Sequence, residues 1–73
     1  MNRDILKLMT VLKRAAKYPD RFSDAEREAM VKLLAVYVES PDPRIASRAV
    51  EALVAMIGFD ADAERLHLQQ VVH

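Results

Sequence analysis

The chain has 73 residues, equal numbers of acidic and basic side chains, and no cysteine. A domain of this length buries only about 60% of its unfolded surface, so we expect an isolated monomer to be marginally stable. The lack of cysteine excludes disulfides, thiolate nucleophiles and thiolate metal sites. Nothing approaches the roughly 20 apolar residues of a membrane span or the apolar region of a signal peptide, so we expect a cytoplasmic protein with no membrane partner.

The first predicted helix covers residues 3–17. Its apolar residues recur at steps of three and four, which places them on one side of an α-helix: Ile5, Leu8, Met9, Leu12 and Ala16. Pro19 disfavours helical geometry at Tyr18 and cannot donate a backbone hydrogen bond, so the helix is expected to end there.

The second predicted helix covers residues 24–39. Ser23 and Glu26 have the spacing of a capping box, in which each side chain accepts a hydrogen bond from the other residue's amide. The second half of this helix is apolar around most of its circumference, which indicates neighbours on more than one side. We therefore predict that it is the central and most buried helix, with Leu34 in the core.

A third helix is predicted over residues 43–57. Asp42 is a good N-cap, and Pro43 falls at the first helical position, where no amide donor is needed. Gly58, the only glycine, falls where a helix commonly ends in a left-handed cap.

A fourth helix over residues 61–72 would then be capped by Asp60 or Asp62. The predicted fold is a single helical domain, residues 1–73: an all-α, compact bundle of about four helices arranged as antiparallel hairpins.

Charge is unevenly distributed along the chain. Up to Phe22 six basic residues face two acidic ones, whereas five basic residues face nine acidic ones beyond it. The first helix places polar residues almost opposite its apolar face: Arg3, Lys7, Thr10, Arg14 and Lys17. This stripe is a candidate contact for phosphates or an acidic partner. An amphipathic helix also has a charged side when nothing binds it, and the acidic remainder of the domain would repel nucleic acid.

No residue set is equipped for catalysis or for a cofactor. Glu64 and His67 have the Glu-x-x-His spacing of carboxylate-bridged metal bundles, but such a site needs a second pair, which the chain lacks. One glycine cannot form a phosphate-binding loop, and no serine has a histidine nearby in sequence. We therefore expect a protein that is not an enzyme and that has neither a metal nor a cofactor.

Residues 33–58 resemble the junction between successive HEAT repeats. The resemblance rests on the run from Asp42 to Ile45 at a helix start and then on Ala49, Glu51, Ala52, Leu53 and Gly58. It implies antiparallel helix pairs stacked side by side, and a protein-binding role. A weaker similarity links the stretch from Ala49 to Met56 to helical regions of phage DNA-packaging small subunits, the small terminases, and it implies that the basic stripe binds DNA.

The leading hypothesis is a non-enzymatic protein-interaction or assembly module that uses a helical face to hold a protein partner or a second copy of itself. The alternative is a nucleic-acid-binding adaptor of the small-terminase type that uses Arg3, Lys7, Arg14 and Lys17. Under the leading hypothesis the last two predicted helices form the contact surface. Its candidate partner-binding residues are Leu66, Leu68, Val71, Val72 and Arg44, the last of which could anchor a carboxylate.

Overall fold

The computed structural model describes the backbone of residues 3–72 and the side chains of residues 3–69. This part of the chain contains no strand, so the all-α prediction is confirmed. Its elements, in chain order, are α1 (Arg3–Lys17), the short 3₁₀ helix η1 (Pro19–Arg21), α2 (Asp24–Tyr37) and α3 (Pro43–Val72).

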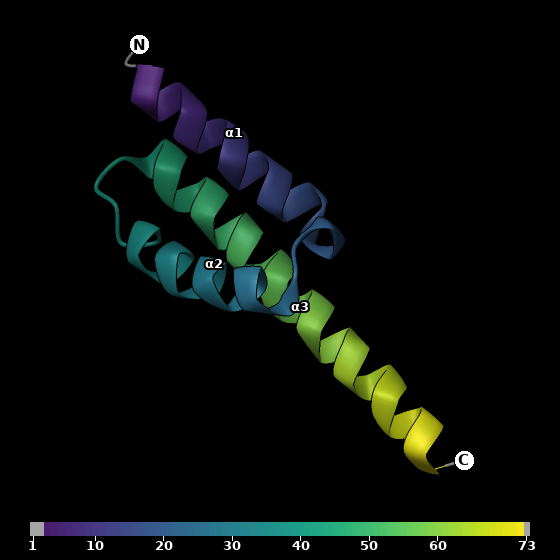
Figure 1. Ribbon diagram of the computed structural model, residues 1–73. Helices are drawn as coiled ribbons and strands as arrows, with labels where there is room; N and C mark the ends of the chain where they lie inside the picture. Colours follow the sequence, from purple (N-terminus) through teal and green to yellow (C-terminus); the bar gives the residue numbers. More distant parts are fainter. Residues whose placement is uncertain (1–2, 73) are drawn as a thin grey trace.

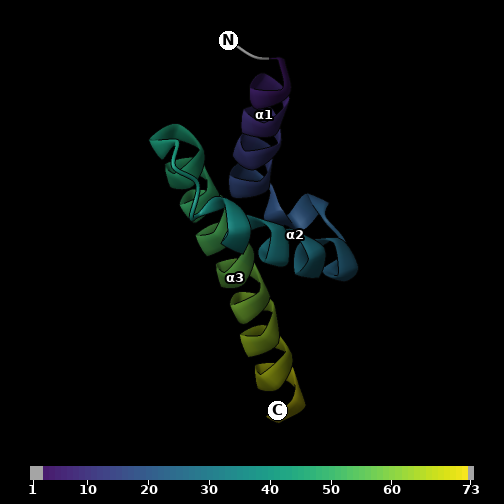
Figure 2. The same ribbon diagram turned by 90° about the vertical axis from the view of Figure 1, so that its left-hand side faces the viewer.

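The three α-helices are arranged around the first half of α3. Figure 1 shows α1 beside this half and running in the same direction, while α2 crosses it and runs back. The second half of α3 continues alone beyond the bundle, and the view turned by 90° in Figure 2 shows the same projection. The molecule is therefore elongated, with extents of 53 × 20 × 17 Å.

Short polar residues fix where the two later helices begin. The capping box at the start of α2 is present: the Ser23 amide donates to Glu26 Oε1 at 2.9 Å, and the Glu26 amide donates to Ser23 Oγ at 3.1 Å. At the start of α3 the Arg44 amide donates to Asp42 Oδ1 at 2.9 Å. These contacts satisfy amide groups that have no partner within the helix.

The core lies where the first half of α3 meets both α1 and α2. It consists of Leu12 and Ala15 from α1, Leu34 from α2, and Ala49, Ala52 and Met56 from α3. The prediction that the second helix is central is wrong, because α3 packs against both other helices. Its buried alanines carry only a methyl group, which lets neighbouring helices approach the α3 backbone closely.

One continuous helix, α3, replaces the two predicted over residues 43–57 and 61–72. Gly58 lies inside this helix and does not adopt a positive φ, so it forms no left-handed cap. A glycine inside a helix costs only about 1 kcal/mol relative to alanine, and no proline follows to stop the helix. Over the described residues, the predicted bundle of about four helices is thus an arrangement of three α-helices, of which α3 is extended.

Candidate interaction surfaces

Arg27, on α2, anchors the point where α3 leaves the bundle. Its side chain is buried, with only 6% of the residue exposed. Arg27 Nε donates to Asp60 Oδ1 of α3 at 2.7 Å, and the guanidinium lies 4.5 Å from the centre of the Phe59 ring. The same group donates to the carbonyl oxygen of Phe22 and to the carboxylate of Asp24.

This cluster ties α3 to the rest of the bundle at the point where the projection begins. Arg27 joins the turn after η1, the start of α2 and the middle of α3 through a single planar group, whose donors point in fixed directions. Asp60, which the sequence suggested as a helix cap, is instead an ion-pair partner in the middle of α3. The contact holds the helix just after Gly58, and it contributes to the continuity of α3 there.

The sequence reasoning missed Arg27, although a signal for it is present. Arg27, Met30, Leu34 and Val38 follow one another at steps of three or four, so they share one face of a helix. Leu34 is fully buried, and Met30 and Val38 pack against the core. A buried cation on the core-facing side of a helix needs hydrogen-bond partners on neighbouring segments. Arg27 has such partners in the turn before α2 and on α3.

A second apolar face of α3 points away from the bundle, and we call it the outward stripe. It comprises Val50, Val54, Ile57, Ala61 and Leu68, which recur at steps of three, four and seven. All five are exposed; Val54 is 65% and Leu68 is 56% accessible. The stripe begins over the bundle and continues on the projecting half of the helix, so only an unbroken α3 can present it as one surface.

The predicted partner-binding residues lie in different surroundings. Leu66 and Leu68 are both exposed, but a separation of two residues places them on nearly opposite sides of the helix. Only Leu68 belongs to the outward stripe. The backbone of Val71 and Val72 continues α3, and their side chains lie outside the described residues.

Arg44 is engaged within its own chain. Its Nε and Nη2 atoms donate to the two carboxylate oxygens of Asp42, at 3.2 and 3.0 Å. The side-chain hydrogen bond from Arg44 lowers the pKa of Asp42 from its ordinary value of 3.8, and the same bond raises the pKa of Arg44. A carboxylate on a partner would therefore have to compete with Asp42 for this guanidinium.

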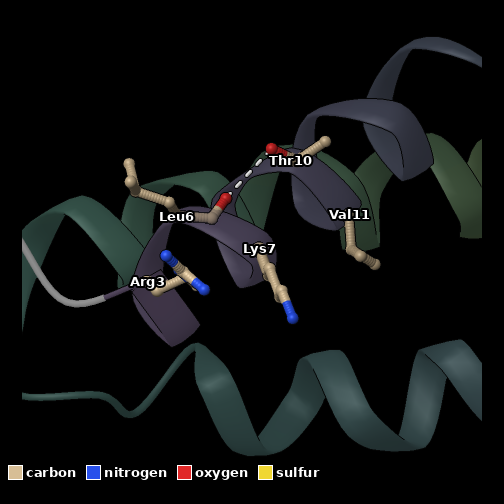
Figure 3. Close-up of a pocket in the computed structure, with 5 residues that line it drawn as sticks. All are labelled: Arg3, Leu6, Lys7, Thr10 and Val11. Carbon is tan, nitrogen blue, oxygen red and sulfur yellow. Dashed lines mark hydrogen bonds between the residues drawn. The ribbon is translucent and has the colours of Figure 1, made fainter.

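The basic stripe predicted on the first helix lies on α1, and all five of its residues are exposed: Arg3, Lys7, Thr10, Arg14 and Lys17. Figure 3 shows three of them with Leu6 and Val11 around a depression of about 450 Å³. All of the lining residues come from one helix, so the depression is an open surface feature. The hydroxyl of Thr10 donates to the Leu6 carbonyl oxygen at 2.9 Å, and its single proton is therefore already used.

The other sequence candidates are not brought together. Glu64 and His67 are exposed on the projecting half of α3. Among the described residues, no three His, Cys, Asp or Glu side chains are grouped so that they could hold a metal ion. Within the same residues, no helix combines the length and the apolar character needed to cross a bilayer.

No protein-family model, curated protein or solved structure matches the chain. The resemblances to HEAT repeats and to phage DNA-packaging small subunits therefore stay predictions, and function has to be argued from the surfaces of the molecule.

Proposed function

We propose that the protein is a non-enzymatic interaction or assembly module that binds a protein partner along the outward stripe of α3. The observation that carries the proposal is the alignment of exposed apolar side chains from Val50 on the bundle to Leu68 on the projection, interrupted only by Glu64. Contiguous exposed apolar surface in a small protein usually marks an interface, whereas single exposed apolar residues are common and need no explanation.

The projecting half of α3 supports the same proposal. Residues 60–69 are all exposed, so this segment has little packing of its own to stabilise it. Helices shorter than about 12–15 residues are marginal in water, and most helical stability in proteins comes from packing of an apolar face. A partner laid along the stripe would supply that packing.

A photo-crosslinking amino acid placed at single positions tests the proposal. It would be introduced at Val54, at Leu68 and, as a control, at Val36, which is 69% exposed but lies on α2. In cells that produce the chain, we expect adducts from the two α3 positions in clear excess over those from Val36. Equal yields at all three positions would overturn the assignment of the outward stripe, whatever the partner is.

A nucleic-acid adaptor is the second candidate, and the observation that favours it is the exposure of the whole basic stripe along α1. Contacts from Arg3, Lys7, Arg14 and Lys17 would be to phosphates, so binding would be weak, independent of sequence and sensitive to salt. Four such contacts give a slope of about −3.6 for log affinity against log salt. Duplex binding that survives reversal of all four charges would exclude this stripe as the site.

A further inference from the structure

We propose that the occupant of the outward stripe is a second copy of the chain, paired antiparallel along α3 about a two-fold axis close to Gly58. This inference rests on the proposed function, because it identifies the partner of that same surface. Four independent observations support it: the exposed area, the spacing of the stripe, the charges beside it and the position of the glycine.

The exposed area is larger than a folded monomer of this size requires. The chain has a mass of 8.3 kDa and an accessible surface of 5541 Å². Monomeric proteins of that mass expose about 4,600 Å². The excess of about 900 Å² is close to the roughly 800 Å² that each partner buries in a standard protein–protein interface.

The spacing of the stripe is that of a helix-pairing seam. With Glu64 included as the one polar member, the spacing along the stripe alternates between four and three residues: Val50, Val54, Ile57, Ala61, Glu64 and Leu68. A repeat of this kind keeps apolar residues facing a second helix, and a single polar position in the seam fixes register and orientation at some cost in stability.

Glu64 favours the antiparallel orientation. In a parallel pair in register the two Glu64 carboxylates would face each other inside the seam. An antiparallel pair instead places Val50 against Leu68 of the other copy, Val54 against Glu64, and Ile57 against Ala61. The two Glu64 residues then lie about 15 Å apart along the axis, because each residue advances a helix by about 1.5 Å.

On the side of the seam that carries Glu51, the charges are complementary in this register. Glu51 of one copy falls beside Arg65 of the other, and the symmetry of the pair forms this contact twice. In the single chain Glu51 is 3.3 Å from Arg48, and Arg65 is 3.7 Å from Asp62. Both pairs are exposed and contribute little individually, so each side chain is available to a new partner.

Gly58 lies beside the proposed two-fold axis. Apart from its two chain neighbours and the nearby backbone of α3, none of the described residues has an atom within 4 Å of a Cβ built at this position, so the bundle has no need for a glycine there. The missing side chain lets two backbones approach closely where the helices cross the axis. This explains a residue that otherwise only weakens α3.

Disulfide trapping tests partner and orientation together, because the natural chain contains no cysteine. Val50→Cys and Leu68→Cys are prepared as separate proteins, both at exposed positions, and are oxidised alone and as a mixture. An antiparallel pair gives crosslinked dimers mainly in the mixture, since the thiol of one variant then lies beside the thiol of the other. The matched control is Leu66→Cys, which lies on the other side of the helix. Mixed with Val50→Cys, it should give no excess of crosslinked dimer.

Each outcome of this experiment decides the proposal. A several-fold excess of crosslinked dimer in the mixture supports it. Dimers formed by each variant alone would show a parallel pair and overturn the orientation, and no dimer in any sample would overturn self-pairing. In that last case, adducts from Val54 to a different protein in the photo-crosslinking experiment would still support the proposed function, so the two failures are distinguishable.

Discussion

The first half of α3, inside the bundle, and its projecting second half belong to one helix but are held in different ways. Up to Met56, α3 is covered on one side by α1 and α2, and small alanines bring the three helices together. Beyond Asp60 the same helix has exposed side chains on every face as far as Gln69. Sequence periodicity cannot distinguish these regions, because both carry apolar residues at helical spacing and only one has neighbours to bury them.

An apolar residue therefore contributes to folding only where the topology gives it a partner. Leu34 and Leu68 are the same residue type on helices, yet Leu34 is fully buried and Leu68 is 56% exposed. Under our proposal, residues such as Leu34 stabilise the monomer and residues such as Leu68 stabilise an assembly. Substitutions at residues of these two kinds should therefore differ in their effect on the free energy of unfolding.

Leu34→Ala should lower the free energy of unfolding by about 2–4 kcal/mol, because it leaves a cavity between α2 and α3. Leu68→Ala is the matched control, and in dilute solution it should change the same quantity by less than about 0.5 kcal/mol. Chemical denaturation of both variants at low protein concentration measures the contrast. Similar losses would mean that the projection is packed against the monomer's own core.

Arg27→Met should destabilise the protein by about 1–3 kcal/mol, because it removes charged hydrogen bonds to Asp60 and to the turn before α2. The loss should not reach the upper end expected for a broken buried pair, because Asp60 is half-exposed and water can solvate it. Arg65→Met removes an exposed pair on the projection and should cost less than about 0.5 kcal/mol. Equal melting temperatures for the two variants would show that Arg27 is not an anchor.

Gly58→Ala should raise the free energy of unfolding of the chain in dilute solution, where it is monomeric, by up to about 1 kcal/mol, because alanine favours the helix and the site in the single chain is open to a methyl group. The corresponding rise in melting temperature is about 4–8 °C for a domain of this size. A fall in melting temperature would indicate that the chain needs a break at this residue, as two separate helices would.

Acid should lower the free energy of unfolding slightly, because protonation of Glu26 weakens the capping box at the start of α2. The backbone hydrogen bond from Ser23, and next its hydroxyl, lower the pKa of Glu26 below its ordinary value of 4.5. Stability from a lowered carboxyl pKa is fully present above the unfolded value and is lost as the pH falls through the folded one. Glu26→Gln should flatten the acid limb of a stability–pH curve, and an unchanged limb would show that this cap is not the origin of the acid sensitivity.

Much of the fold follows from local signals in the sequence, whereas the projection does not. Spacing and cap chemistry predict the all-α class, the capping box at Ser23 and the burial of Leu34, and all three are confirmed. These local signals miss the continuity of α3, because a lone glycine is compatible with both the end and the interior of a helix. The tertiary contact of Arg27 with Asp60 favours the continuous helix. The sequence makes Leu66 and Leu68 candidate contact residues and both are exposed, but their separation onto opposite faces matters only once the helix is unbroken.

Sedimentation equilibrium of the wild-type chain, Leu68→Glu and Leu66→Glu measures whether two copies pair through the outward stripe. The two leucines are similarly exposed and lie two residues apart, but only Leu68 belongs to the outward stripe. Measurements should extend to a protein concentration of about 1 mM. At that concentration half of the chains are paired even if the free energy of dimerisation is only about −4 kcal/mol. We expect the wild type and Leu66→Glu to approach twice the 8.3 kDa mass of one chain, and Leu68→Glu to remain at that mass. A monomeric wild type, or equal masses for the two variants, would contradict self-pairing through the outward stripe.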